Sequence, residues 1–273
     1  MAFHEKSKPI FEPTSLADAR SLPDQTTTHK SLADEIPIAI VFDGTSVAVM
    51  MATPADIRDF AYGFALTEGY ITGLDDVRDF EVAQHKLGIE ARFWLVTTRA
   101  QAMMERRRSL VGFMGCGLCG IESLEQAVRT LPEIQNTHRT MSQETVIAAP
   151  DMLRSQQHLH DQTRATHAAG FLTERAGMIC AREDVGRHNA LDKLIGSLAF
   201  CGINTEEGAI VVTSRLSVEL VQKCAFARCP ILISVSAPTA HAVRLANKAN
   251  ITAIAFARRE KCEIFTHPDR IKM

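Results

Sequence analysis

The sequence lacks any run of about 18 consecutive apolar residues, the minimum length for a helix that crosses a bilayer. Its first ten residues, MAFHEKSKPI, are mixed and polar. They contain neither the apolar stretch nor the small-residue cleavage site of a secretory signal. We therefore expect a cytoplasmic protein that is not inserted in a membrane.

An excess of charge of one sign is also missing. The 30 lysines and arginines nearly balance the 32 aspartates and glutamates, and the formal net charge is −2. A protein that coats nucleic acid needs a broad positive field, so we expect no nucleic-acid partner, although a local basic patch remains allowed. No Walker motif and no G-x-G-x-x-G motif occurs, so ordinary kinase and dehydrogenase functions lack support.

The seven cysteines are odd in number and mostly scattered, which is a poor basis for a disulfide framework and fits a reducing compartment. Four of them lie in or beside apolar or helical stretches. These four are predicted to be small buried hydrophobic residues: Cys180, Cys201, Cys224 and Cys262.

The N-terminal part of the chain divides into a polar arm and a mixed α+β region. Residues 1–34 are polar and contain several prolines and threonines, so we expect a flexible arm. Order is expected to begin at residue 35, and region 35–135 includes the cysteine loop 112–120. Two β-rich runs flank Asp43-Gly44, which is a strong signal for a hairpin.

A helix is predicted to follow this hairpin, with Thr53 as its N-cap, Pro54 at its first position and Gly69 at its end. Two more strands are expected near 77–82 and 89–98. The region should therefore be a small antiparallel sheet with one helix.

Residues 136–273 show a different pattern, in which strand-like and helix-like segments alternate. Such alternation implies crossover connections and a mostly parallel sheet with flanking helices, an α/β fold. Strands are expected over 178–181, 209–213, 231–235 and 251–257, with helices near 188–198, 217–227 and 238–249. Further helices are expected near 121–131 and 150–160.

The loop Gly115-Cys-Gly-Leu-Cys-Gly120 places two cysteines in a glycine-rich segment. Four interpretations remain open for it: half of a zinc site, a thioredoxin-like redox pair, a structural role, or a nucleophilic thiol. The three arginines at 106–108 and a predicted downstream helix favour the last, because positive charge and helix N-termini lower the pKa of a thiol.

The carboxyl ends of the predicted strands carry a second signal, because ligands of open α/β sheets bind outside these ends. The segments that follow the strands are rich in arginine, hydroxyl groups and helix starts, which bind phosphate. We therefore expect an anionic ligand such as a nucleotide or pyrophosphate at this edge. Its candidate residues include Arg187, His188, Ser214 and Arg215.

These motifs, in this order, resemble the FdhD family of formate dehydrogenase accessory sulfurtransferases. The resemblance runs from about Glu35 to the C-terminus. Besides the cysteine loop, it rests on Glu183-Asp-Val-Gly-Arg-His-Asn-Ala-Leu-Asp-Lys193, Ser214-Arg-Leu-Ser-Val-Glu-Leu-Val-Gln-Lys223 and Ser234-Val-Ser-Ala-Pro-Thr239.

The resemblance implies a sulfurtransferase that takes sulfur from a cysteine desulfurase as a persulfide on Cys116. The acceptor would be the molybdenum cofactor, Mo-bis(molybdopterin guanine dinucleotide), which then serves formate dehydrogenase. A guanine nucleotide would mimic this acceptor. Cys119 would either help release the sulfur or shape the loop. The resemblance also implies a cytidine deaminase-like core, a homodimer, and a cofactor-binding stretch at Phe256, Ala257, Arg258, Arg259, Glu260 and Lys261.

One position departs from the family pattern. The family often has Thr-Gly-x-Thr-His-Ala-Ala where this chain has Thr163-Arg-Ala-Thr-His-Ala-Ala169, so Arg164 replaces a flexible position. His167 is kept within this segment.

Two rival functions follow from the same features. A non-catalytic escort would bind the cofactor or the apoenzyme, with zinc at Cys116 and Cys119. A zinc deaminase is suggested by the implied fold, but it needs H-x-E followed by P-C-x-x-C. Here the segment His167-Ala168-Ala169 lacks the glutamate and follows the cysteine pair.

Overall fold

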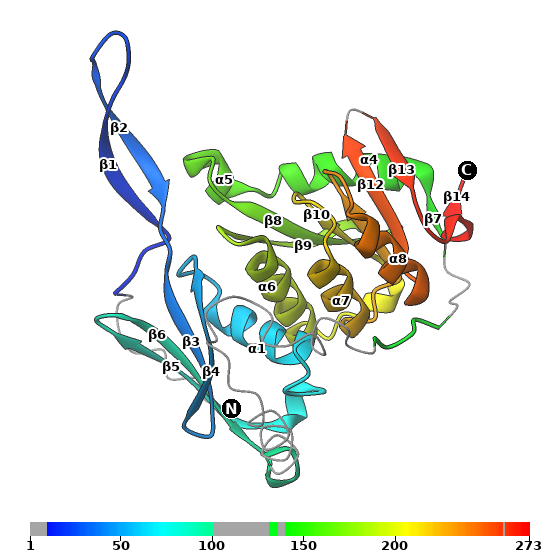
Figure 1. Cartoon of the computed structure of the whole chain (residues 1–273), viewed down its shortest axis with the longest axis horizontal. Coiled ribbons are helices and arrows are strands. Elements are labelled where there is room, and N and C mark those ends of the chain that lie inside the picture. Colours follow the sequence, from blue (N-terminus) through cyan, green and yellow to red (C-terminus); the bar gives the residue numbers. More distant parts are fainter. Residues whose placement is uncertain (1–9, 101–130, 136–139, 259) are drawn as a thin grey trace.

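The computed structural model describes residues 10–100, 131–135, 140–258 and 260–273. Its larger part is a six-stranded sheet in the order β13-β12-β11-β10-β8-β9 (Figure 1). The strands are β8 (His167–Thr173), β9 (Gly177–Asp184), β10 (Ala209–Val212), β11 (Ile231–Ser234), β12 (Thr252–Arg258) and β13 (Lys261–Ile264).

Strands β10, β11 and β12 pair in parallel. Strand β8 pairs antiparallel with both β10 and β9, so β9 runs in the same direction as β10, β11 and β12. The predicted α/β fold class is confirmed, and the carboxyl ends of four strands meet at one edge. The insertion of β8 between β9 and β10 was not predicted.

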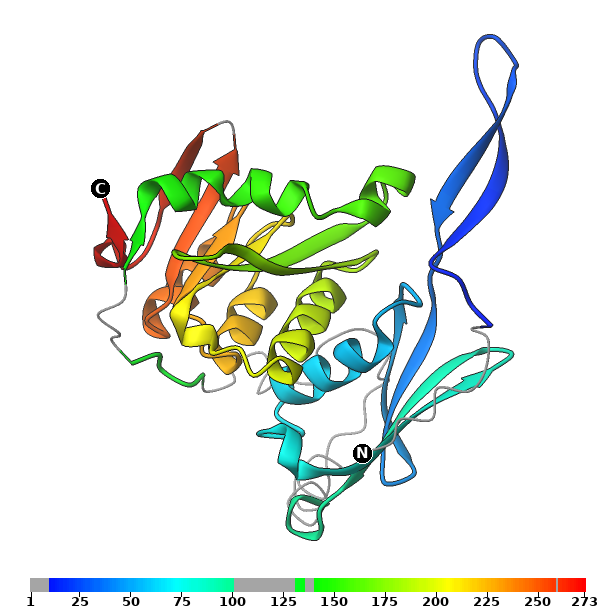
Figure 2. The ribbon, with the colours of Figure 1, turned by 180° about the vertical axis from the view of Figure 1, so that it is seen from behind.

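Helices cover both faces of this sheet (Figure 2). In β10, Ile210 and Val212 pack in the core on one face, while Ala209 and Val211 pack on the other, as the two-residue period of a strand requires. The first face is covered by α6 (Arg187–Phe200), α7 (Val218–Phe226) and α8 (Ala240–Lys248), and the second by α4 (Gln143–Arg154).

The helix predicted near 150–160 is wrong in its bounds. Helix α4 begins earlier, because the hydroxyl of Ser142 accepts a hydrogen bond from the Thr145 N–H at 3.3 Å and caps it, with Pro150 inside the helix. A separate short helix, α5 (His158–Thr163), follows. The helix predicted near 121–131 lies almost entirely outside the described residues.

The N-terminal sheet has the order β4-β3-β6-β5. The hairpin at Asp43-Gly44 is confirmed, with φ values of 45° and 78° at the two turn residues. Strands β3 and β6 pair in parallel, so the sheet is not wholly antiparallel as predicted. Its elements are β3 (Ile36–Phe42), β4 (Thr45–Ala52), α1 (Ile57–Thr67), β5 (Val77–His85) and β6 (Gly88–Leu95).

Thr53 is not the N-cap of α1, which corrects the prediction. The helix begins at Ile57, and Asp56 precedes it in the left-handed region at φ 53°. The Thr53 hydroxyl instead accepts a hydrogen bond from the Val185 N–H at 3.1 Å, and Thr53 is fully buried. This residue therefore joins the N-terminal region to the end of β9.

Residues expected to form a loose arm include a regular hairpin. Strands β1 (Thr14–Arg20) and β2 (Thr27–Ala33) pair antiparallel over their whole length. The hairpin projects away from the rest of the molecule (Figure 1). Both faces of this ribbon are exposed, so neither face needs apolar residues and the sequence shows no alternation of apolar and polar residues. The polar composition therefore predicted a flexible arm instead of two strands.

Helices α1 and α6 cross at two glycines. A Cβ atom at Gly63 would lie 1.7 Å from the Asp192 carbonyl oxygen, and one at Gly196 would lie 1.9 Å from the Asp59 carbonyl oxygen. Each helix therefore brings a glycine against the backbone of the other, which fixes the N-terminal region on the larger sheet.

Short elements complete the described chain. They are the 3-10 turns Leu74–Asp76, Thr205–Glu207 and Pro268–Arg270, and the parallel pair β7 (Met141–Ser142) and β14 (Ile271–Lys272). No helix among the described residues is long and apolar enough to cross a membrane.

Candidate functional site

The carboxyl edge of the six-stranded sheet gathers most of the predicted site residues. Strand β9 ends at Asp184 and leads to the start of α6, and β10 ends at Val212 and leads to the start of α7. Strand β12 ends at the turn into β13. Adjacent strands lie about 4.8 Å apart, and β12 is three positions away from β8 in the sheet order. The start of β8 and the end of β12 are therefore roughly 14 Å apart along this edge.

Arg187 and His188 form the first turn of α6, as predicted for an edge site. The Arg187 Nε and His188 Nε2 atoms are buried, and neither has a hydrogen-bond partner among the residues that the structure describes. Burial, followed by the charges of Arg187 and Lys223, lowers the pKa of His188 to about 4. At neutral pH this imidazole is uncharged, so its 3.8 Å approach to Glu219 is not an ion pair. The Arg187 Nε–H can therefore donate to a ligand, and His188 Nε2 can donate or accept according to its tautomer.

Ser214 and Arg215 follow β10, but the structure separates their roles. Ser214 is buried, and its hydroxyl donates to the Arg215 carbonyl at 3.2 Å. Its own carbonyl accepts from the Ser234 hydroxyl at 2.7 Å, so Ser214 ties β10 to β11. Arg215 is exposed at the edge and is the group of this pair that can meet an anion.

The predicted stretch 256–261 forms the end of β12, the turn, and the start of β13. The pairing register shifts between Ala255 and Arg258, and Phe256 adopts a positive φ of 53°. Arg258, Glu260 and Lys261 are exposed, whereas Ala257 is buried. Arg259 lies outside the described residues. Two cationic side chains therefore stand at the edge, three strands away from β8.

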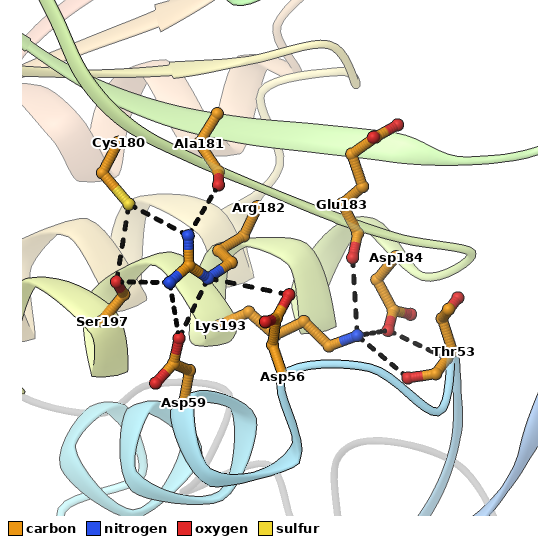
Figure 3. A network of polar contacts seen from close by, with 10 residues as sticks. All are labelled: Thr53, Asp56, Asp59, Cys180, Ala181, Arg182, Glu183, Asp184, Lys193 and Ser197. Carbon is orange, nitrogen blue, oxygen red and sulfur yellow. Dashed lines mark hydrogen bonds and ion pairs between the residues drawn. The ribbon is translucent and has the colours of Figure 1, made fainter. Parts of the chain in front are cut away.

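Other residues of the 183–193 motif build a buried junction instead of a binding surface (Figure 3). Lys193 Nζ lies 2.7 Å from Asp184 Oδ2, and both side chains have no exposure. The Asp184 carboxylate accepts from the Thr53 N–H at 3.0 Å, and Lys193 donates to the Thr53 carbonyl at 3.0 Å. This ion pair therefore holds the chain between β4 and α1 against α6.

A second, partly buried contact joins β9 to α1 (Figure 3). The Arg182 guanidinium donates from Nε and Nη2 to Asp59 Oδ2 at 2.9 and 2.8 Å. It also donates to the Ser197 hydroxyl at 2.8 Å and lies 3.3 Å from Cys180 Sγ. All four groups thus serve the α1–α6 contact.

A third cluster joins α1, α6 and α7. Lys223 Nζ donates to Asp192 Oδ2 at 2.9 Å, to the Thr67 hydroxyl at 3.0 Å and to Glu68 Oε1 at 3.0 Å. Burial raises the pKa of Asp192 to about 6, although Lys223 opposes the shift. Burial alone would lower the pKa of Lys223, and the charges of Asp192 and Glu68 outweigh it and raise that pKa.

These charged residues belong to the segments that resemble the family, but the sequence alone indicated no role for them. The sequence does contain a sign that these residues are buried, because Asp192 and Lys193 stand next to Leu191 and Leu194 in an otherwise apolar helix. Charged residues within such a face are buried only when they are paired. The sequence does not reveal that they also bond to Thr53 and Thr67, which lie more than 100 residues away in α1 and before it.

Cys116, Cys119 and the arginines at 106–108 lie outside the described residues, so their predicted roles remain predictions. Cys224 is buried as predicted, and Cys180 and Cys262 are half-buried. Cys201 is exposed, which corrects its prediction. It follows the last turn of α6, where the chain faces solvent. Among the residues that the structure describes, no three His, Cys, Asp or Glu side chains gather as a metal site.

Taken with the fold, this edge defines an α/β protein in which basic side chains line the carboxyl ends of the strands. The model of the FdhD/NarQ family matches residues 33–272. The chain belongs to this family.

Two curated relatives and one solved structure are similar to the chain. The "Sulfur carrier protein FdhD" of Agrobacterium fabrum is 46% identical over 245 residues, 90% of each chain. Its namesake in Bordetella bronchiseptica is 48% identical over 240 residues, 88% of this chain and 87% of the relative. The crystal structure of "a putative formate dehydrogenase accessory protein" from Desulfotalea psychrophila has a TM-score of 0.74 at 22% identity. It covers 95% of this chain and 99% of that one, and at this identity it supports the fold alone.

Proposed function

We propose that this chain is a sulfur carrier that accepts sulfur as a persulfide on Cys116 and passes it to an acceptor bound at the carboxyl edge. The observation that carries this proposal is the name of its relatives, which are 46% and 48% identical over about nine-tenths of the chain. The buried Arg187 Nε, which has no hydrogen-bond partner among the described residues, supports an anionic acceptor at the edge.

The loading step is a displacement at sulfur. The Cys116 thiolate attacks the terminal sulfur of the donor's persulfide, a new S–S bond forms on Cys116, and the donor's cysteine leaves as a thiolate. The donor in this proposal is a cysteine desulfurase. The step consumes no reductant, because one sulfur–sulfur bond replaces another.

The acceptor in this proposal is Mo-bis(molybdopterin guanine dinucleotide), which would then serve formate dehydrogenase. Its phosphates suit Arg187, Arg215, Arg258 and Lys261, since guanidinium and ammonium groups pair with phosphate oxygens. The proposal places the reaction in the cytoplasm and in a homodimer. GDP is the simplest probe of the acceptor site, because it carries guanine and a pyrophosphate.

Intact-mass spectrometry after incubation with a cysteine desulfurase and cysteine tests the carrier step. We expect the wild-type protein to gain one sulfur, about 32 Da, and Cys116→Ala to gain none. Cys201→Ala is the matched control, because it removes an exposed cysteine away from the loop and should keep the gain. A gain that survives in Cys116→Ala contradicts the proposal.

Metal analysis separates the carrier from the zinc-bound escort. A carrier thiol must be free to attack sulfur, so the purified protein should hold no stoichiometric zinc. One zinc per chain that is lost in Cys116→Ala would favour the escort instead.

A further inference from the structure

The four-stranded N-terminal sheet has two edge strands, β4 and β5, and they differ in charge. An edge strand presents unpaired N–H and C=O groups, and proteins usually protect such an edge with charged side chains, proline, bulges or short length. Strand β5, with the sequence VRDFEVAQH, carries Arg78, Asp79 and Glu81. Strand β4 is eight residues long, has the sequence TSVAVMMA, and contains no charged residue and no proline. Its side chains therefore do not protect its edge.

The other long edges of the described sheets do carry charge. The charged residues on these edges are Lys261 and Glu263 of β13, Arg182, Glu183 and Asp184 of β9, and Asp18, Arg20 and Lys30 of the β1–β2 hairpin. Among the described edge strands of four residues or more, β4 alone lacks a charged side chain. This strand is therefore the one that is suited to accept a further strand.

The backbone of Val49 points out of this edge. Along residues 48–52, β4 pairs with β3 without a register shift, and Met51 lies opposite Pro37. Pro37 has no N–H, and the Met51 carbonyl accepts from Asn189 Nδ2 at 2.9 Å, outside the sheet. The backbone groups of Met51 therefore face away from β3. Their direction repeats every second residue, so those of Val49 face outward too, and no other described element bonds to them.

The side chains beside this edge are apolar and exposed. Val49 is 64% exposed and Met51 is 49% exposed. They are two residues apart, so they lie on the same face of the sheet, opposite Ala39 and Pro37 of β3. This face is turned away from the core that the sheet forms with α1, which contains Ile38. A strand added along the edge would continue this apolar stripe.

We propose that β4 is the contact between two copies of this chain, with the two β4 strands antiparallel across a two-fold axis at Val49. The two four-stranded sheets then join into one continuous sheet. The inference deepens the homodimer of the proposed function and rests on it, because it names the surface through which the two chains meet.

The sequence of β4 favours its own copy as the partner. In a two-fold arrangement centred on Val49, this residue meets the same residue of the second copy. The flanking pairs are Met51 with Val47 and Met50 with Ala48, so each pair is apolar and none brings like charges together. Because the N–H and C=O groups of Val49 point outward, the central pair exchanges two hydrogen bonds. Such a contact closes after two chains and does not continue into a fibre.

Sedimentation equilibrium of the full-length protein tests the contact. The wild type should dimerise reversibly, and Val49→Lys should raise the dissociation constant of the dimer about a hundredfold or more, because two lysines then face each other on the axis. Val49→Thr keeps a neutral, β-branched side chain and should dimerise nearly as the wild type does. Leu87→Lys is the matched control. It places the same charge on an 87% exposed apolar residue in the β5–β6 turn and should leave the dissociation constant unchanged.

Cross-linking gives a second readout, which does not depend on the folding of the lysine variant. The Cα atoms of a hydrogen-bonded antiparallel pair lie about 5.5 Å apart, within the range that a disulfide spans. With oxidised glutathione, Val49→Cys should form a disulfide between the two copies at position 49, located by peptide mass. One glutathione disulfide is reduced to two thiols for each bond formed. Leu87→Cys should form no such link at position 87.

The proposal is overturned if the wild-type protein is monomeric at every concentration measured. It is also overturned if Val49→Lys, shown to be folded by circular dichroism, dimerises as tightly as the wild type, or if Val49→Cys forms no link at position 49. Each of these results would leave the edge to another occupant, such as a strand of a partner enzyme.

Sulfur loading by the desulfurase is measured separately by mass. Loading of a monomeric wild-type protein would reject the β4 contact and keep the carrier. A dimer that depends on position 49, without loading of Cys116, would reject the carrier and keep the contact.

Discussion

The segment 183–193 serves two regions of the molecule that treat charge in opposite ways. In the buried junction, Asp184 and Lys193 are fully enclosed and pair with each other. At the carboxyl edge, the neighbouring Arg187 and His188 each have a buried side-chain nitrogen without a hydrogen-bond partner in the described part of the chain. A buried charge that is paired within the chain stabilises the fold. A buried polar atom without a partner costs free energy in the free protein, and a ligand that bonds to it removes that cost. Residues of one motif, a few positions apart, can therefore either hold the fold together or face a ligand.

The largest expected effect comes from breaking the junction. Asp184→Asn leaves the Lys193 charge buried without its partner, and it should lower the free energy of unfolding by about 3 to 5 kcal/mol. Urea denaturation measures this loss. Adding Lys193→Met to the same chain should recover part of it, because no buried charge is then unpaired.

The control for this variant is Glu90→Gln, which breaks the half-exposed pair between Glu90 and Arg92. Exposed pairs contribute under about 1 kcal/mol, so this loss should be much smaller. Equal losses of unfolding free energy in Asp184→Asn and Glu90→Gln would show that the buried Asp184–Lys193 pair contributes no more to stability than an exposed pair.

The next effect tests the glycine contact between α1 and α6. Gly63→Ala places a Cβ 1.7 Å from the Asp192 carbonyl, so the two helices must separate. We expect a loss of about 1 to 3 kcal/mol or more in the free energy of unfolding, measured in the same way. Gly73→Ala is the matched control, since no atom of the described residues lies within 4 Å of its added Cβ. A loss in the control as large as that in Gly63→Ala would remove the steric explanation.

A smaller effect concerns pH and links the edge to stability. The pKa of His188 falls from 6.5 in the unfolded chain to about 4 in the folded one, because of burial and the charges of Arg187 and Lys223. Glu219 and Glu68 also face it and oppose the shift. The unfolded chain therefore binds the proton first as pH falls. The contribution is fully present above pH 6.5 and is lost between pH 6.5 and about 4.

His188→Gln isolates this contribution, because it removes one titrating group and keeps the others, Asp192 included. The difference in unfolding free energy between wild type and variant, measured from pH 7.5 to 4, should change across this window. A difference that stays constant with pH would show that His188 titrates normally.

The smallest effect on stability belongs to the exposed end of the edge. Arg258→Ala with Lys261→Ala should change the free energy of unfolding by less than about 0.5 kcal/mol, because both side chains are exposed. The same double variant should weaken GDP binding several-fold and reduce its dependence on salt, since two cations are lost. Lys86→Ala, in the turn between β5 and β6, should leave GDP affinity unchanged. Unchanged affinity in the double variant would remove this turn from the acceptor site.

The sequence predicted those features that depend on local chemistry. The Asp43-Gly44 turn and the alternation of β9–α6, β10–α7 and β11–α8 follow from turn residues and hydrophobic period, which act over a few positions. It did not predict β8, whose residues His-Ala-Ala-Gly-Phe-Leu-Thr include few strong strand formers, nor the parallel pairing of β3 with β6. Both depend on distant partners.

The candidate site was predicted in the same uneven way. Arg187, His188 and Arg215 could be placed at the edge, because the carboxyl ends of parallel strands meet there. A polar cavity of about 450 Å³ at the same edge could not, since its wall, which includes Gln157, combines α5, β8 and Thr213 at the end of β10. The burial of Gln157 depends on that packing, and a lone glutamine carries no sign of it in the sequence.

The cluster around Lys223 also constrains the order in which a new chain can finish folding. The hydrogen bond from Lys223 to Thr67 spans 156 residues. At roughly 5 to 20 residues per second, a ribosome needs on the order of 8 to 30 seconds to make that stretch. Until then, the contacts of Lys223 in α7 with Thr67 and Glu68 cannot form. The N-terminal region is therefore made first but completed late. Helix α1 is exposed to aggregation and to cleavage while the rest of the chain is synthesised.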